Sequence, residues 1–265
     1  MSKKFVTPFF AFWLFFWFCY GYCFGQASKE DSTFVTKTVY PATTLLYGQS
    51  DGGDMKMRCT ATAIEKNATG YVFATAAHCA CEDNEETHTA SAEKVFFFIT
   101  SDDQKEKTFL AAKPIACGYQ HAGDDFSLFQ VDTDSKFPVV ELGEDAKPMD
   151  AIANVASPLG LGRQIFVGSV TATDLQRPVV LEDINWTHTA LLQLFGTDGG
   201  SSGSAVICLD QKKICAFVVG TYNRSSIVAM PVSRLVKMRA DLKAGTYKHY
   251  EADPDAIPGA KKGAK

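Results

Sequence analysis

The sequence lacks the excess of positive charge and the compositional bias that mark several large classes of protein. Its 265 residues carry 26 basic and 30 acidic side chains, so no nucleic-acid partner is expected, because such binding usually needs a basic surface. Hydrophobic residues make up 46% of the chain and charged residues 21%, which excludes a disordered, collagen-like or low-complexity protein. Internal repeats are also missing. The length allows one large all-β domain or two small ones.

A long apolar run occurs in only one place, between residues 5 and 25, where 12 of the aromatic residues are found. The run follows two lysines and ends with small residues at Gly25 and Ala27, which is the pattern of a secretory signal peptide. We therefore predict a signal peptide at residues 1–27. An uncleaved membrane anchor is the alternative, because a run of this length can span a bilayer. In both cases the rest of the chain is expected outside the cytoplasm, secreted or periplasmic, with membrane association only if the segment is retained.

The cysteines are few but even in number once this segment is set aside. The remaining six are Cys59, Cys79, Cys81, Cys117, Cys208 and Cys215. An even number in an exported chain predicts disulfides, although the composition alone leaves the pairing open. Cys208 and Cys215 bracket a predicted turn and should face each other across a hairpin. The close pair Cys79 and Cys81 lacks the second pair that a zinc site needs, so no metal is expected.

No long amphipathic helix separates the short β-like runs, which argues against a parallel α/β sheet and favours a barrel or a sandwich. One helix is predicted from Val232 to Ala244, where apolar residues recur at helical spacing and Gly245 follows as a stop signal. Residues 246–265 are then expected to form a flexible tail to a domain at 28–245. The predicted strands are residues 34–40, 60–64, 71–75, 95–100, 109–116, 126–131, 151–155, 164–171, 191–195, 204–208, 216–221 and 227–230.

Three segments carry residue types that serve nucleophilic catalysis. His78 follows an apolar strand, Asp124 and Asp125 lead into an alternating strand, and a turn rich in glycine and serine at residues 199–204 precedes another strand. Each alone has an ordinary explanation, as a buried histidine, a turn aspartate or a flexible loop. All three in one exported β-rich chain, in the order His, Asp, Ser, predict a catalytic triad.

The chemistry explains why these residue types are needed together. A serine hydroxyl is a weak nucleophile unless a base takes its proton, and an imidazole can take that proton and return it to the leaving amine. A buried carboxylate orients the imidazole, and glycines beside the serine let two N–H groups point at one oxyanion. We assign these roles to Ser202, His78 and Asp125, with the amides of Gly200 and Ser202 as the oxyanion hole.

The segments TAAHC (75–79), DFSL (125–128) and GSSGS (200–204) resemble, in order, the catalytic motifs of the trypsin-fold serine proteases. The resemblance covers about residues 34–244, and the stretches at 156–171 and 218–232 are most similar to bacterial HtrA-like members. It implies an all-β fold of two packed six-stranded antiparallel barrels with a C-terminal helix. No PDZ domain is expected, since too few residues follow the helix.

The implied activity is that of a serine endopeptidase, which acts on protein or peptide substrates through an acyl-enzyme. No cofactor and a monomeric state are expected. A catalytically silent binding protein on the same fold is the alternative, which the complete set of catalytic residue types disfavours. The family pattern places the acid directly before an apolar strand residue and the nucleophile directly before glycine. It therefore favours Asp125 over Asp124 and Ser202 over Ser201.

The same resemblance bears on the disulfides. Cys59 and Cys79 match the family's bridge beside the catalytic histidine. With the hairpin pair of Cys208 and Cys215, this leaves Cys81 and Cys117 as the third bridge.

Specificity and activation are predicted mainly from charges that are missing. Trypsin-type members hold a carboxylate six residues before the nucleophile, where this chain has Gly196. The substrate pocket is expected to be lined by Gly196, Thr197, Gly220 and Thr221 and to prefer small or medium apolar residues before the scissile bond. Asp198 is expected to face solvent.

Activation is predicted from Ser201. In family members that are activated by N-terminal cleavage, an aspartate at this position pairs with the newly freed amino terminus. Ser201 carries no charge, so this ion pair is not expected.

Overall fold

The computed structural model describes most of the chain that follows the predicted signal peptide. The described residues are 28–101, 108–120, 123–175, 179–181, 184–186, 189–194, 196–223 and 226–247. The predicted signal peptide or anchor, and the predicted tail from residue 248 onward, lie outside these residues. Within the described part, none of the helices combines the length and the apolar character that crossing a membrane would require.

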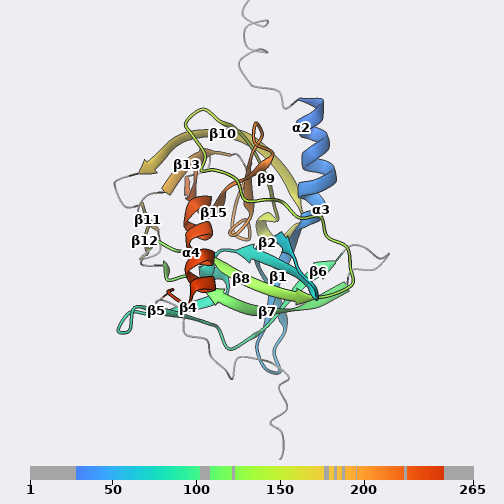
Figure 1. Cartoon of the computed structure of the whole chain (residues 1–265), viewed down its shortest axis with the longest axis vertical. Helices are drawn as coiled ribbons and strands as arrows, with labels where there is room; N and C mark the ends of the chain where they lie inside the picture. Colours follow the sequence, from blue (N-terminus) through green and yellow to red (C-terminus); the bar gives the residue numbers. More distant parts are fainter. Residues whose placement is uncertain are drawn as a thin grey trace, which may run out of the picture.

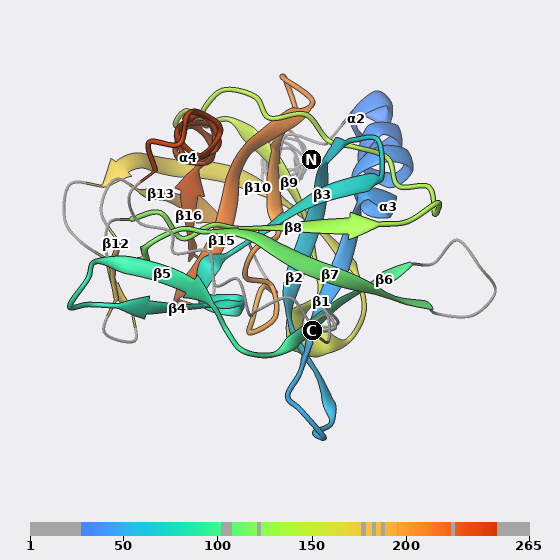
Figure 2. The same ribbon diagram turned by 60° about the horizontal axis from the view of Figure 1, so that its bottom comes forward.

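The first half of the chain forms a closed antiparallel barrel, drawn mainly in blue and green in Figure 1. Phe73, Ile99 and Phe129 are among the largest side chains that are completely buried in it. In order around the barrel, its strands are β1 (Thr43–Gln49), β2 (Met55–Lys66), β3 (Gly70–Thr75), β8 (Ser127–Asp132), β7 (Thr108–Cys117) and β6 (Phe96–Ser101). A separate hairpin, seen at the edge of the barrel in Figure 2, consists of β4 (Cys81–Asn84) and β5 (Thr89–Ala92).

The second half forms another closed antiparallel barrel, above the first in Figure 1. The two six-stranded barrels confirm the predicted fold class. In order around the second barrel, the strands are β10 (Gln164–Leu175), β13 (Thr189–Gln193), β16 (Ser226–Pro231), β15 (Lys213–Asn223), β14 (Ala205–Cys208) and β9 (Ala151–Ala156). Two short segments, β11 (Val179–Leu181) and β12 (Ile184–Trp186), pair with each other, and a 3₁₀ turn, η4 (Pro158–Gly160), follows β9.

One contact between the two barrels is a pair of aromatic side chains. Phe126, just before β8, and Phe217, on β15, are completely buried, and their ring centroids lie 5.7 Å apart in an edge-to-face arrangement. Buried aromatic pairs of this kind contribute both apolar area and a favourable ring geometry. Since Phe126 directly follows Asp125, this contact holds the candidate acid at the junction between the barrels.

The predicted C-terminal helix is confirmed as α4 (Val232–Ala244). Leu235 and Met238 on its inner face are buried, and Gly245 ends it with a φ of +69°, a left-handed conformation that favours glycine. Tyr247, which the sequence places in the tail, packs back on the fold, where its hydroxyl lies 3.3 Å from a carboxylate oxygen of Asp124. The folded part of the chain therefore includes Tyr247.

The strand predicted at residues 34–40 is wrong, because this segment is helical. It spans α2 (Lys29–Phe34), a π-helical turn η1 (Val35–Val39) and α3 (Tyr40–Ala42), drawn in blue in Figure 1. The first strand of the barrel is β1 instead, which the sequence prediction missed.

Two local features explain why the helix forms despite several β-branched residues. Ser28 and Asp31 form a capping box, in which each side chain accepts a hydrogen bond from the other residue's amide at 3.0 Å. Val35 and Val39, four residues apart, are both buried, and they belong to the same hydrophobic core as the buried residues of the first barrel. That spacing places them on one face of a helix, so capping and tertiary burial outweigh β propensity.

Three disulfides occur among the described residues, and they join the pairs named from the sequence. Cys59–Cys79 links β2 to the segment after β3, Cys81–Cys117 links β4 to the end of β7, and Cys208–Cys215 crosses the hairpin of β14 and β15.

Candidate active site

His78 and Asp125 meet because they lie at the ends of two neighbouring strands. Thr75 at the end of β3 pairs with Ser127 at the start of β8, so the residues just beyond this pair are close in space. His78 lies in a short 3₁₀ turn, η2 (Ala77–Cys79). Its Nδ1 is 2.8 Å from Oδ2 of Asp125, and its backbone N–H donates to Oδ1 at 3.0 Å. Both carboxylate oxygens therefore hold the histidine.

The burial of this pair suits its geometry. The side chain of Asp125 is completely buried, whereas 27% of the His78 side chain is exposed. A buried carboxylate is costly unless its oxygens accept hydrogen bonds, and His78 supplies two of them. The imidazole is thus oriented through Nδ1 while the ring remains partly accessible.

The structure separates the two neighbouring aspartates. Asp124 does not replace Asp125 at His78, because its Oδ2 lies beside the hydroxyl of Tyr247. Burial raises the pKa of Tyr247 above its ordinary value, and the charge of Asp124 raises it further. Asp124 is therefore placed to hold Tyr247 against the fold, and Asp125 is the acid that faces the histidine.

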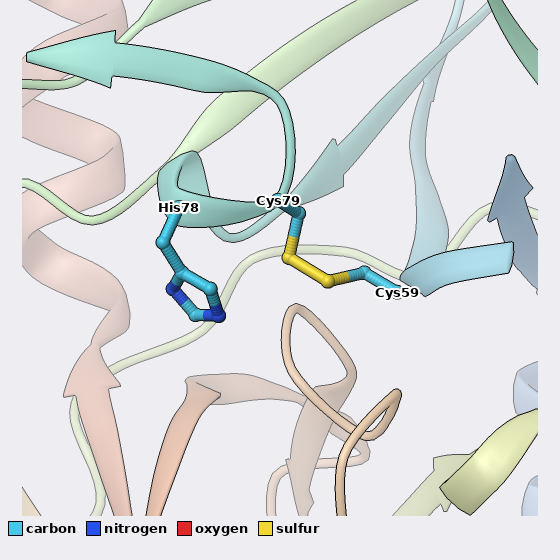
Figure 3. Close-up of side chains that lie close together, drawn as sticks. All are labelled: Cys59, His78 and Cys79. Atoms are coloured by element: carbon cyan, nitrogen blue, oxygen red, sulfur yellow. A yellow bond between two sulfur atoms is a disulfide. The ribbon is translucent and has the colours of Figure 1, made fainter. Parts of the chain in front are cut away.

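A disulfide lies next to the histidine. Figure 3 shows His78 projecting from its turn next to the bridge between Cys59 and Cys79. A ring nitrogen of His78 and both sulfur atoms lie within 4.8 Å of one another. The sulfurs are bonded to each other and so do not act as thiolate ligands. The disulfide fixes Cys79, the residue directly after His78, to β2.

The turn at residues 199–204 depends on two glycines with positive φ. Gly203 has a φ of +77°, and a Cβ there would lie 2.0 Å from the hydroxyl oxygen of Thr75 and 2.6 Å from the amide nitrogen of Ala76. The turn is therefore pressed against the strand end that leads to His78. Gly200 has a φ of +92°, and a Cβ there would lie 2.7 Å from the carbonyl oxygen of Ser157. Only glycine fits such positions without strain.

Four amides of this turn are used within the protein and two are not. Among the described residues, those of Gly200 and Ser202 donate to no protein acceptor. The other four donate as follows: Gly199 to Asp198 Oδ1 (2.7 Å), Ser201 to Asp198 O (2.9 Å), Gly203 to Val218 O (2.7 Å) and Ser204 to Ser201 O (3.1 Å). Backbone donors normally find partners, so two uncommitted N–H groups in one turn are suited to bind an anionic oxygen.

The two serines of the turn differ in exposure. Ser201 is 2% exposed, and its hydroxyl accepts a hydrogen bond from the amide of Asp198 at 3.3 Å. Ser202 is partly exposed, and its carbonyl accepts from the amide of Thr60 at 3.0 Å. In the described part of the chain no hydrogen bond joins the Ser202 hydroxyl to His78. Main-chain contacts hold the turn against β2 and against the end of β3, the strand that leads to His78. In apo proteins the hydrogen bonds between catalytic groups are often long and tighten only when substrate binds.

The predicted pocket residues come from two segments of the chain. Gly196 and Thr197 precede the turn, and Gly196 has a φ of +85° beside the ring of Phe166. Gly220 and Thr221 lie on β15. This strand contacts the turn through Val218, whose carbonyl accepts a hydrogen bond from the amide of Gly203. None of the four predicted residues carries a charge, and the pocket that they would form stays a prediction. Asp198 is exposed, as expected.

A cavity of about 300 Å³ lies elsewhere, between the second barrel and the start of α4. Asp145, Ser233 and Arg234 are among its lining residues, and it includes none of the candidate catalytic residues. Asp145 is engaged there by the amide and the hydroxyl of Ser233 at 2.8 and 2.6 Å.

Sequence reasoning missed Thr60, a buried residue of β2 whose main chain and side chain both contact the turn. Its only signal in the sequence is its place directly after Cys59.

Comparisons with solved structures agree with the fold described above. The chain is similar to the HtrA-type protease AlgW, whose structure was solved with a tripeptide (TM-score 0.60, 15% identity, 81% of this chain and 64% of that chain covered). It is also similar to the Rv3671c protease from M. tuberculosis in its active form (0.60, 14%, 78% and 82%). A serine endoprotease from Yersinia pestis gives comparable values (0.57, 15%, 82% and 68%). Identities this low show the fold alone, and the chain spans less than two thirds of AlgW.

A comparison with curated proteins finds no match. The family described as the trypsin-like peptidase domain matches residues 59–217, which is more than half of the chain and includes His78, Asp125 and Ser202. The chain therefore belongs to the trypsin-like peptidase domain family.

Proposed function

We propose that the protein is an exported serine endopeptidase, with Ser202 as nucleophile, His78 as general base and acid, and Asp125 as the acid that orients the histidine. One observation carries the proposal. A buried Asp125 holds His78 just beyond the strand end that the turn at residues 199–204 contacts, and among the described residues of that turn only the amides of Gly200 and Ser202 lack protein acceptors. These are the groups that acyl transfer requires.

The reaction would proceed in two balanced steps. The Ser202 oxygen attacks the substrate carbonyl while His78 takes the hydroxyl proton, and the amides of Gly200 and Ser202 stabilise the oxyanion. When the tetrahedral intermediate collapses, His78 gives the proton to the leaving amine and an acyl-enzyme remains. Water then attacks the ester with His78 again as base, which releases the acid product and restores Ser202. Asp125 stabilises the imidazolium in both steps.

The substrate preference is proposed from the absence of charge around the turn. Gly196, Thr197, Gly220 and Thr221 offer no carboxylate to a substrate ammonium, and burying one without a partner is costly. Asp198 is exposed and binds the amide of the next residue. Cleavage is therefore expected mainly after Val, Ala, Leu or Met, as a preference rather than a strict rule. A peptide-library profile dominated by Lys or Arg before the scissile bond would contradict this and would point to Asp198.

Export and activation complete the proposal. Three disulfides suit an oxidising compartment, and a signal peptide at residues 1–27 would deliver the chain there.

The buried Ser201 is uncharged, so no ion pair with a new N-terminus forms at this position. Enzyme with extra residues before Ser28 should therefore be active as produced, and strict dependence on a native N-terminus would count against this.

The central test is covalent labelling by a fluorophosphonate probe. The full chain, purified after export, should be labelled and should degrade casein. Ser202→Ala should lose both properties, with turnover lowered by roughly 10⁴- to 10⁶-fold. Ser201→Ala is the matched control and should retain labelling. Loss in Ser201→Ala with retention in Ser202→Ala would move the nucleophile, and a folded but unlabelled wild type would favour the silent binding protein.

A further inference from the structure

Thr60 joins two separate loops of the second barrel from its position in the first. Its side chain is completely buried on β2. The hydroxyl donates a hydrogen bond to the carbonyl of Gly200 at 2.8 Å and accepts one from the amide of Ser157 at 3.1 Å. A threonine hydroxyl has a single hydrogen to donate, so the bond to Gly200 uses it.

The main chain of Thr60 makes two further contacts that do not depend on its side chain. Its amide donates to the carbonyl of Ser202 at 3.0 Å, and its carbonyl accepts from the hydroxyl of Thr75 at 2.8 Å. A substitution that removes only the hydroxyl should leave both bonds in place. The role of the hydroxyl can therefore be separated from that of the backbone.

The hydroxyl acts on the peptide units on both sides of Gly200. The N–H of Gly200 belongs to the same planar peptide unit as the carbonyl of Gly199 and points away from it. That carbonyl accepts from the amide of Leu159 at 2.6 Å. Leu159 lies in η4, which begins directly after Ser157, the residue whose amide Thr60 holds. The carbonyl of Gly200 itself is held by the hydroxyl.

Glycine makes this support necessary. Gly200 has a φ of +92°, and glycine rotates about its backbone bonds more freely than any other residue. Without a contact that holds its neighbouring peptide units, its N–H group would sample several directions. An oxyanion hole stabilises a transition state only when its donors already point at the developing charge.

We propose that the Thr60 hydroxyl is a positioning group for the oxyanion hole, which keeps the Gly200 amide directed at the transition-state oxyanion. The inference rests on the proposed peptidase function. Thr60 is completely buried and acts only through the turn and η4. Removing the hydroxyl should therefore weaken transition-state stabilisation more than substrate binding.

The test compares Thr60→Val, which keeps the shape but loses the hydroxyl, with Thr60→Ser, which restores it. Thr62→Val is the matched control. Thr62 lies on the same strand and is completely buried, and its hydroxyl has no hydrogen-bond partner in the described part of the chain. The kcat and KM are measured on a quenched-fluorescent peptide built from the fastest casein cleavage site, with enzyme counted by fluorophosphonate titration. The inhibition constant of a peptidyl trifluoromethyl ketone, which forms an oxyanion on the enzyme, is measured in parallel.

Thr60→Val should lower kcat by about 10- to 100-fold, since loss of a whole oxyanion donor costs about 10²- to 10³-fold. The KM should change by less than about twofold, and the ketone should bind more weakly by about the same factor as kcat/KM falls. Thr60→Ser should recover to within about threefold of wild type, and Thr62→Val should match wild type.

Equal kinetics of Thr60→Val and Thr62→Val would overturn the inference, as would a loss in Thr60→Val that lies wholly in KM. If Thr60→Val folds poorly, Thr60→Ser is compared with Thr60→Ala per titrated site, and equal kcat values would overturn it. A folded wild type that neither cleaves casein nor reacts with the probe would overturn the peptidase function and this inference together. If the inference alone fails, the wild type still cleaves casein and reacts with the probe, so the two failures can be told apart.

Discussion

The two barrels hold their parts of the candidate site by different means. The first barrel presents the histidine side, His78 and Asp125, through a buried carboxylate and the adjacent disulfide. The second barrel presents the turn side, residues 199–204, through main-chain hydrogen bonds and two left-handed glycines. The histidine side should therefore be sensitive to changes of functional group. The turn side should be sensitive to atoms added at Gly200 and Gly203.

Among changes that leave the nucleophile in place, the largest effect is expected on the histidine side, from Asp125→Asn. The amide keeps the size of the carboxylate but loses the charge that stabilises the imidazolium, and it can select the wrong tautomer of His78. We expect kcat to fall by about 10⁴-fold, as in triads of this type, measured on the quenched-fluorescent peptide. The fold should survive, because Oδ1 can still accept the bond from the His78 amide.

Asp124→Asn is the matched control for this change. It alters the neighbouring residue, whose carboxylate contacts Tyr247 rather than His78. Its kcat should stay within about threefold of wild type. Equal losses in the two variants would show that the register of this segment is wrong.

The next effect concerns the turn side, in Gly203→Ala. The added methyl would collide with Thr75 and with the backbone of Ala76, in addition to the strain of a left-handed alanine. We expect the free energy of unfolding to fall by more than about 3 kcal/mol in urea titrations. Gly52→Ala is the control, since Gly52 has a similar φ of +67° with nothing within 4 Å of the added atom. It should lose only about 1 kcal/mol. Similar losses in the two variants would refute the close packing of the turn.

The smallest difference is expected between two disulfides. Replacing Cys59 and Cys79 by alanine opens a bridge of sequence separation 20, and replacing Cys208 and Cys215 opens one of separation 7. Chain entropy predicts stability losses of about 3 and 2.5 kcal/mol. The distinguishing readout is kcat at a temperature where both variants are folded. Only loss of Cys59–Cys79 should lower it, because only that bridge braces His78, and equal kcat values would contradict this.

Much of the fold could be predicted because its signals are local. Alternating apolar residues locate most strands of both barrels, and the spacing of Leu235 and Val236 with Gly245 predicts α4 correctly. The failure at residues 34–40 is instructive. The β-branched residues there suit a strand, but the capping box at Ser28 and the burial of Val35 and Val39 favour a helix. Burial depends on the rest of the fold and has no local signal.

The sequence by itself determined which residue types could perform the chemistry and which motifs carry them, because His78, Asp125 and Ser202 stand in short recognisable segments. The family resemblance already favoured Asp125 over Asp124, but only the tertiary structure places Asp125 against His78, through the pairing of β3 with β8. It also brings the hydroxyl of Thr60 to a carbonyl 140 residues away in the chain, and the proposed role of Thr60 rests on this contact. Hydrogen bonds between distant segments are set by how the two barrels pack, and no local pattern records that packing.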